Sequence, residues 1–581
     1  MPIEFTLMQM ELRKGAKDTV FLINKLKDYD LDEIAFYIPQ ILNIAYQSEF
    51  CVEFAFIFAD LVRENFILGL KIYWMMRARL KNPQNSKSVE HMLCEVTKAI
   101  EKRPLPLFYK EIQCDALDFN SYCSEYFINQ RKIFKRLVKI SIELINKGDE
   151  KDNYLKAFIK NIDSWIKNTC YRYSFNKSEY VKKLYRGLIL PTSDNDIIRQ
   201  IIRIPDEEVF YYQTKARVPF KVVFETIFLS ENDPDQIESP IITTLPDESS
   251  FSSFSSISET LPDRDTLRFE NLENFTIQDF TDEYEIIPYQ NPNVKSDYDP
   301  WGERWEETKS RIKSLSPFNL YQTWDAKAFI IKGNDDLRQE LLAMQIIKKC
   351  KEIFKNEKLP LFLHPYDIII VSHNTGIIEC IPDAVSLHTL KKHTRCLTTF
   401  FISKWGKCLQ KAQQNFVRSM AGYSLICYLL NLKDRHNGNI LMDTKGHIIH
   451  IDFGFFLTNS PGKINLESTA FKLTNEMIEI MGGRNSEMFF EFKTLFYRGL
   501  MKLRDNSREL SLLLTMMYPG ENLPCFYNKD KAVIEFRERL LLGKNELECT
   551  ERVEYLIDNA ADNWRTNKYD QFQYTSNKIL Y

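Results

Sequence analysis

The residues best suited to carry chemistry lie in one stretch, KDRHNGNILMDTKGHIIHIDFG, at positions 433–454. Two short apolar runs, 440–442 and 448–451, flank a turn at 443–446. Apolar runs on either side of a polar turn predict a β-hairpin. Because a hairpin returns the chain to its starting edge, the residues just before its first strand and just after its second strand are expected to meet.

Four polar side chains occupy these two ends. Asp434, His436 and Asn439 precede the first strand, and Asp452 directly follows the second. We expect Asn439 and Asp452 to lie side by side, where an amide oxygen and a carboxylate would bind a hard cation such as Mg²⁺, with Mn²⁺ as the alternative. His436 and Asp434 are suited to moving the proton of a hydroxyl during phosphoryl transfer.

A second signal lies upstream, in FIIKGNDDLRQELLAMQII at positions 329–347. The run 329–332 predicts a strand that ends in Lys332, and the acidic start at Asp336 predicts a helix over 336–354. A strand lysine that faces a cleft can pair with ATP phosphates, and a carboxylate on the following helix can hold it in place. The two signals together predict ATP-dependent phosphoryl transfer.

The order of the loop residues carries a family resemblance. Protein kinases use H-R-D-x-x-x-x-N, whereas this chain has D-R-H-N-G-N at 434–439 and D-F-G at 452–454. This arrangement resembles the phosphoinositide 3- and 4-kinase family. The resemblance implies that His436 activates the substrate hydroxyl, with Asp434 in support.

The same resemblance implies an ATP site. Lys332 takes the position of the ATP lysine, and Glu340 takes that of the helix acid. The segment 361–392 resembles the strand pair and hinge between the two lobes. The adenine would contact Tyr366 in the pocket wall and backbone groups of Glu379 and Ile381.

A phosphate-covering loop is expected at 314–318, SLSPF. It contains no glycine, so it differs from the glycine-rich loop of protein kinases and fits the lipid-kinase branch. Its implied ATP-binding residues are Ser314, Leu315 and Ser316.

The segment after D-F-G, at 455–483, resembles the type III beta phosphatidylinositol 4-kinases. Its basic residues are few, and Lys463 and Lys472 are the candidates for a substrate loop. A kinase for inositol lipids that already carry phosphates would need more cations to pair with them. The segment therefore favours plain phosphatidylinositol as the substrate.

The tail at 568–581 resembles the terminal helix of the family, which lies near the membrane. Two positions depart from the family pattern. Gly333–Asn334 stands where the family usually has Cys-Gly, and Gln571 stands where it usually has Gly.

The favoured function is transfer of the ATP γ-phosphate to the 4-hydroxyl of phosphatidylinositol. A phosphoinositide 3-kinase is the first alternative, although no C2-like or Ras-binding region is evident. A protein kinase of the same superfamily is disfavoured because those chains are far larger. A pseudokinase scaffold is the non-enzyme alternative, but it should lack at least one core residue, and all of them are present.

The elements that must position these residues change in character along the chain. Apolar residues recur at helical spacing in 31–45, 52–66 and 127–144, and these helices are expected to stack as hairpins. The runs 198–204, 209–212 and 218–228 predict strands because they are β-branched and aromatic. Further strands are expected around 324–332, 367–372 and 377–380, with a helix at 305–313 and mainly helices from 386 onward.

The predicted fold class is α+β. It comprises a bilobal lipid-kinase catalytic domain, with a mixed β-sheet N-lobe and a mainly helical C-lobe, preceded by an all-α helical-hairpin domain. The Ser-rich acidic segment 233–299 is expected to be disordered because it cannot bury enough apolar area. The domain boundaries are helical domain 1–165, connection and first N-lobe strands 166–232, insertion 233–299, N-lobe 300–380, and C-lobe with a membrane-proximal terminal helix 381–581.

Composition limits the partners of this 581-residue chain. A net charge of -3 provides no global attraction to nucleic acid. The twelve cysteines form no CxxC pair, and the start has no apolar secretory signal, so a reducing cytoplasmic compartment is expected. The resemblance implies a peripheral position on Golgi or other internal membranes, with a small GTPase and a calcium-sensor protein as partners.

Overall fold

The computed structural model describes residues 2–13, 18–80, 86–101, 116–175, 187–192, 199–212, 217–228, 299–394, 396–461, 469–518 and 523–581. The insertion predicted to be disordered lies outside these residues, apart from Asp299. Lys463 also lies outside them.

The described part of the chain up to Phe175 is helical, and the helices expected at 31–45, 52–66 and 127–144 are present. Asn65 separates two buried helices and caps the second, since its side chain accepts a hydrogen bond from the Leu68 N–H. The helices are α1 Ile3–Leu12, α2 Asp18–Lys25, α3 Leu31–Gln47, α4 Cys51–Glu64, α5 Phe66–Arg79, α6 Ser86–Glu101, α7 Ala116–Glu143 and α8 Lys151–Phe175.

The strands of the N-lobe form one antiparallel sheet. Their order is β1-β2-β4-β5-β7-β6, and β3 pairs with β4 outside this path. The strands are β1 Leu188–Ile189, β2 Arg199–Arg203, β3 Phe210–Tyr211, β4 Phe220–Phe228, β5 Asp325–Gly333, β6 Ile368–Ser372 and β7 Thr375–Glu379. The predicted strand positions are thus confirmed to within two or three residues.

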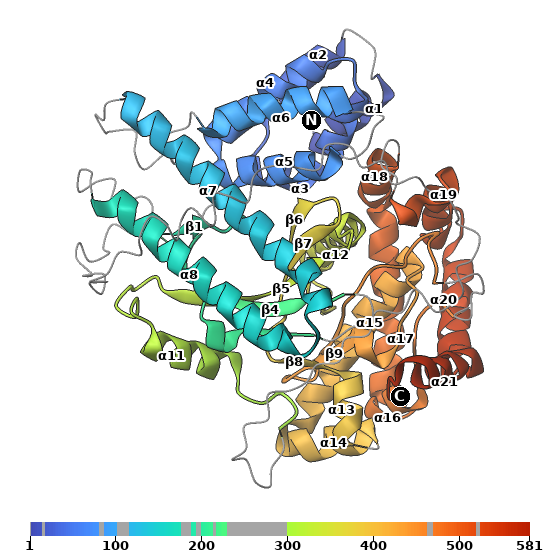
Figure 1. Ribbon diagram of the computed structural model, residues 1–581. Helices are drawn as coiled ribbons and strands as arrows, with labels where there is room; N and C mark the ends of the chain where they lie inside the picture. The colour runs from blue at the N-terminus through green and yellow to red at the C-terminus, as the bar shows by residue number, and fades with distance from the viewer. Residues whose placement is uncertain are drawn as a thin grey trace, which may run out of the picture.

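The central strands β4 and β5 are buried on both faces. On one face, α7 contacts β5, β6 and β7, and α8 contacts β2; the two helices run side by side across the sheet in Figure 1. On the other face, α11 (Trp305–Leu315) covers a separate apolar cluster that includes Val223, Ala326 and Ile312. Because alternate residues of a strand share a face, Lys332 lies on the same face of β5 as Ala326, but at the other end of the strand.

Helix α12 (Arg338–Asn356) follows β5 and packs against the C-lobe helices α17 and α18. The C-lobe also holds the small sheet β10-β9-β8, made of β8 Ala384–Ser386, β9 Ile440–Asp443 and β10 Ile448–His450. Its helices are α13 Leu387–His393, α14 Leu397–Trp405, α15 Leu409–Leu430, α16 Asn475–Ile480, α17 Glu487–Asp505, α18 Ser507–Met517, α19 Asp530–Arg539, α20 Glu546–Ala560 and α21 Trp564–Asn577.

The structure confirms the predicted α+β fold class: a helical N-terminal region is followed by a sheet-based lobe and a mainly helical lobe (Figure 1). None of the described helices is both long and apolar enough to cross a membrane.

Gly333, one of the two departures from the family pattern, lies where α7 meets the end of β5. A Cβ atom at this position would come within 2.2 Å of Ser141 Oγ and 2.7 Å of Ile142 Cγ1, so the close approach of the helix requires glycine. Asn334 then takes a left-handed backbone with φ of 55°, which asparagine tolerates better than most residues.

Candidate active site

The predicted hairpin is present, and it brings the two ends of the motif together. Strands β9 and β10 pair antiparallel, with His450 opposite Ile440. Just beyond the paired strands, the Ile451 N–H donates to the Asn439 carbonyl at 3.1 Å. This bond places Asn439 beside the backbone that leads into Asp452.

Arg435 holds the second end of the hairpin, a role that the sequence reasoning missed. Its guanidinium donates to the carbonyls of Lys433 at 3.0 Å and Ile451 at 2.7 Å, and also to that of Asp452. It is buried and lies over the Phe453 ring at 5.7 Å from the centroid. Arginine presents a rigid fork of donors, which suits it to fixing several carbonyls at once.

The donor atoms of Asn439 and Asp452 fit a divalent cation. The Asn439 amide nitrogen donates to the Asp434 carbonyl at 3.0 Å and to its Oδ2 at 3.4 Å, so the amide oxygen is the atom left to face a cation. Burial opposes ionisation of Asp452, but the charges of Lys332 and Arg435 hold its pKa below the ordinary value. An ionised carboxylate and an amide oxygen make a hard, oxygen-only donor pair.

His436 and Asp434 lie next to this pair. His436 Nδ1 accepts from the Gly438 N–H at 3.1 Å, and its Nε2 lies 3.8 Å from Asp434 Oδ1. Burial lowers the pKa of His436, although Asp434 opposes the shift, so the ring is neutral near pH 7. A neutral imidazole whose Nε2 faces a carboxylate can take up a proton at Nδ1.

Lys332 is buried near the C-terminal end of β5, where it forms an ion pair of 3.6 Å with Asp335. Arg217 pairs with the same carboxylate at 2.7 Å. The predicted helix acid, Glu340, accepts a hydrogen bond from the Tyr366 hydroxyl. Burial raises the pKa of Glu340, and the Lys332 charge opposes the rise, so the lysine acts on both Glu340 and Asp452.

Gln339 is a second residue that the sequence reasoning missed. Its side-chain NH₂ donates to the carbonyls of Phe453, at 3.2 Å, and Gly454, and its oxygen accepts from the Cys525 N–H at 2.8 Å. Helix α12 therefore holds the D-F-G segment through Gln339, and its next residue, Glu340, lies within the electrostatic influence of Lys332.

The predicted hinge residues lie at and after the end of β7. Glu379 pairs with Phe329 of β5, and its N–H donates to the Asp367 carbonyl at 2.9 Å. Ile381 follows the strand and is partly exposed. Their contacts with adenine stay predictions.

The predicted phosphate-covering loop is wrong. Ser314 and Leu315 belong to helix α11, and Ser316 is buried with its hydroxyl donated to the Glu225 carboxylate. Glu225 lies opposite Ala326, six residues along β5 from Lys332, which is about 20 Å at the rise of a strand. The sequence suggests this loop because the segment lacks glycine and carries serines. In the structure, however, the Ser316 hydroxyl is buried inside the N-lobe, where it binds Glu225.

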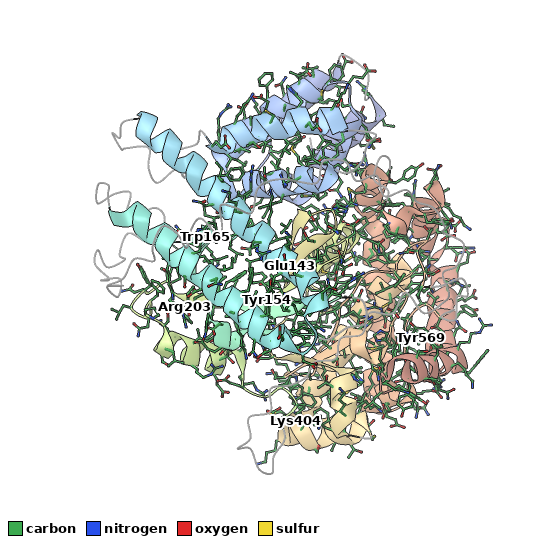
Figure 2. All side chains as sticks on the ribbon, in the orientation of Figure 1. Glu143, Tyr154, Trp165, Arg203, Lys404 and Tyr569 are labelled. Atoms are coloured by element: carbon green, nitrogen blue, oxygen red, sulfur yellow. The ribbon has the colours of Figure 1, made fainter. Side chains whose placement is uncertain are left out.

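Two further observations support this correction. Arg203 pairs with Glu225 at 2.6 Å, and Figure 2 shows Arg203 well separated from Tyr569, which bonds to Asp434. The ends of β3 and β4 are the part of the sheet that lies near Lys332, because Tyr211 pairs with Phe220 and Phe220 pairs with Ile331.

The prediction for Lys472 is also wrong. Its ammonium lies 2.6 Å and 2.7 Å from the two carboxylate oxygens of Asp570 in α21, and both side chains are almost fully buried, with exposures of 3% and 4%. A lysine committed in this way does not reach a lipid headgroup. The other candidate, Lys463, lies outside the described residues.

Comparison with known proteins agrees with this geometry. A family model described as phosphatidylinositol 3- and 4-kinase matches residues 326–526. The chain is 45% identical to a phosphatidylinositol 4-kinase of Dictyostelium discoideum over 292 residues, which is 49% of this chain and 25% of that protein. It is 41% identical over 283 residues to phosphatidylinositol 4-kinase beta of Xenopus tropicalis, covering 48% and 35% of the two chains. It is 43% identical over 289 residues to phosphatidylinositol 4-kinase beta 1 of Arabidopsis thaliana, covering 48% and 26%.

The sheet lobe, the helical lobe and the D-R-H hairpin between them define a kinase catalytic domain. Residues 326–526 match the model of the phosphatidylinositol 3- and 4-kinase family, and the beta-type resemblance predicted from the sequence is confirmed by these relatives. The alignments with these relatives cover only 25% to 35% of the relatives' own length.

Proposed function

We propose that this chain transfers the γ-phosphate of ATP to the 4-hydroxyl of phosphatidylinositol. The observation that carries the proposal is the meeting of Asn439 and Asp452 at the open end of the hairpin, next to Asp434 and His436 and within the electrostatic reach of Lys332. The names of the relatives favour the 4-kinase reading over a 3-kinase or a pseudokinase scaffold.

In the proposed site, Lys332 binds the ATP phosphates, with Glu340 and Asp335 nearby to orient the ammonium. Asn439 and Asp452 hold a divalent cation, which we propose to be Mg²⁺, with Mn²⁺ as the alternative. A cation held by these two residues would supply positive charge to offset the negative charge that develops on the transferred phosphoryl group.

His436 is the proposed base for the lipid hydroxyl. The hydroxyl replaces the Gly438 N–H at Nδ1 and gives its proton to that nitrogen. The imidazolium that forms keeps its Nε2–H toward Asp434, now 3.8 Å away, and the carboxylate stabilises the new charge. Tyr366, Glu379 and Ile381 are proposed to contact the adenine.

The family resemblance extends the proposal to location and partners. We place the chain at the periphery of Golgi or other internal membranes, where a small GTPase and a calcium-sensor protein regulate it. These assignments rest on the resemblance and not on any contact within the described residues.

Turnover of phosphatidylinositol vesicles with labelled ATP tests the proposal. The wild-type chain should label the lipid in the presence of Mg²⁺, and Asp452→Ala should reduce the rate by at least about 1,000-fold, because the transition state loses its cation. Circular dichroism and the thermal midpoint of the variant serve as folding controls. Equal rates for the variant and the wild type would contradict the metal assignment, and an inactive wild type would favour the scaffold.

A further inference from the structure

Helix α21 presents a line of buried polar side chains to the catalytic loop. Tyr569, Gln573 and Asn577 are spaced four residues apart, so they share one face of the helix. Their exposures are 5%, 2% and 5%. Burying polar groups is unfavourable unless each one is hydrogen-bonded. The hydrogen-bond partners of these three side chains therefore indicate their role.

The hydrogen bonds run in one direction. The Asn577 NH₂ donates to Gln573 Oε1 at 2.7 Å, and the Gln573 NH₂ donates to the Tyr569 hydroxyl at 2.7 Å. The Tyr569 hydroxyl then donates to Asp434 Oδ1, which also receives Gln573 Nε2 at 3.4 Å. A chain of donors that ends on a carboxylate is polarised along its length, and the last bond is the charge-assisted one.

Asp434 needs such support. Its backbone is left-handed, with φ of 62°, and its Oδ1 is the oxygen that lies 3.8 Å from His436 Nε2. The other oxygen, Oδ2, is 3.4 Å from the Asn439 amide nitrogen. The Tyr569 hydroxyl therefore fixes the carboxylate from the side opposite Asn439.

The helix that carries Tyr569 is itself held in place. Asp570, the next residue, forms the buried ion pair with Lys472 in the segment that follows the hairpin. Beyond the helix, the Leu580 carbonyl accepts from the Asn437 side chain at 3.1 Å, and the Leu580 N–H donates to His388 Nδ1 at 2.9 Å. Helix α21 thus contacts the catalytic loop through Tyr569, which Figure 2 labels, and through Gln573, and the chain beyond the helix contacts the loop through Leu580.

We propose that Tyr569 is a positioning residue for phosphoryl transfer, which holds the Asp434 carboxylate beside His436 through its hydroxyl. This inference rests on the proposed function, since it assigns Tyr569 a role in the same reaction. It makes α21 part of the catalytic apparatus, in addition to the membrane-proximal role expected for the terminal helix.

The test is Tyr569→Phe, which removes one hydroxyl and keeps the ring. Rates are measured on a short-chain phosphatidylinositol that is monomeric in solution, so that membrane binding does not contribute. We expect kcat to fall by about 10- to 100-fold, as is typical when a partner that orients a catalytic ligand is lost. The KM for ATP should stay close to the wild-type value, because the ATP site is untouched. The thermal midpoint should fall by no more than a few degrees, because one buried hydrogen bond is lost while the packing of the ring is kept.

Two further variants sharpen the test. Gln573→Met removes the donor to Tyr569 and should lower kcat by a smaller factor. Tyr555→Phe, at an exposed tyrosine of the preceding helix α20, is the matched control and should leave kcat unchanged.

The outcomes separate the alternatives. A normal kcat for Tyr569→Phe, or a lowered kcat that is fully explained by loss of folded protein at the assay temperature, would overturn the positioning role. A loss seen on vesicles but not on the monomeric lipid would assign Tyr569 to membrane binding and would also overturn it. An inactive wild-type chain would contradict the proposed function itself, whereas an active wild type beside an equally active variant would contradict this inference alone.

Discussion

Asn439 and Asp452 lie where the sequence predicts them because the hairpin that joins them is local. Their adjacency depends only on a turn and two short strands. Ser316 and Lys472 were misplaced because their partners are remote: Glu225 is 91 residues from Ser316, and Asp570 is 98 residues from Lys472. The type of a residue near a motif indicates which ligands it could bind. For Ser316 and Lys472, the actual partner is a carboxylate that is distant in sequence.

Ser316→Ala tests the corrected role of this serine. The substitution leaves the buried Glu225 carboxylate without one of its donors, which should destabilise the fold by about 1–3 kcal/mol. The KM for ATP should not change, since Ser316 lies at the far end of β5 from Lys332. Urea unfolding and ATP-dependent kinetics measure the two effects, with Ser314→Ala, on the exposed side of α11, as the control. A large rise in the KM for ATP at unchanged stability would restore Ser316 to the phosphate loop.

At the scale of the elements, the sequence predicts the N-lobe strands and several helices but not how they attach to one another. The residue pattern predicts α12 and the family resemblance implies α21, yet neither shows that Gln339 of α12 binds the D-F-G backbone or that α21 faces Asp434. Gln571, the second departure from the family pattern, lies on the exposed side of α21 and leaves the helix unbroken. Polar residues at four-residue spacing, such as Tyr569 and Gln573, were the available signal for a buried polar face.

The attachment of α21 can be tested through its buried ion pair. Lys472→Met leaves Asp570 buried without its cation, which should destabilise this helix by about 3–5 kcal/mol. Amide hydrogen exchange in α21 should accelerate accordingly. Because an apolar pair can replace a buried ion pair, Lys472→Met combined with Asp570→Leu should restore most of the protection. Unchanged exchange in the single variant would show that the pair does not hold the helix.

At the scale of the whole molecule, the helical N-terminal region and the kinase lobes share one core. The main apolar cluster runs without interruption from α1 through both lobes to α20. Buried polar residues of helix α3 also join the helical region to the kinase lobes. Gln40 and Gln345 of α12 exchange hydrogen bonds of 2.7 and 2.8 Å, and Asn43 donates to the Met516 carbonyl at 2.7 Å. Sequence composition can indicate the boundary between the helical N-terminal region and the kinase lobes. It does not reveal that such contacts join the two.

This junction yields a prediction for stability. Gln40→Leu removes a buried partner of Gln345 and should destabilise the chain by about 1–3 kcal/mol. The helical region and the kinase lobes should still unfold in one thermal transition, because they share the core. Differential scanning calorimetry measures both, and Gln410→Leu on the exposed surface of α15 is the matched control. Two separate transitions in the wild-type chain would contradict a shared core.

The position of the phosphate on the product tests the central claim most directly. Phosphatidylinositol vesicles are incubated with the wild-type chain, ATP and Mg²⁺, and the deacylated product is compared with authentic 3-, 4- and 5-phosphate standards. The geometry around Asp434, His436, Asn439 and Asp452 predicts a phosphorylated lipid, and the named relatives predict that the phosphate is on the 4-position. Phosphatidylinositol 3-phosphate would contradict the assignment while leaving the kinase chemistry intact, and the absence of any phosphorylated lipid would contradict both.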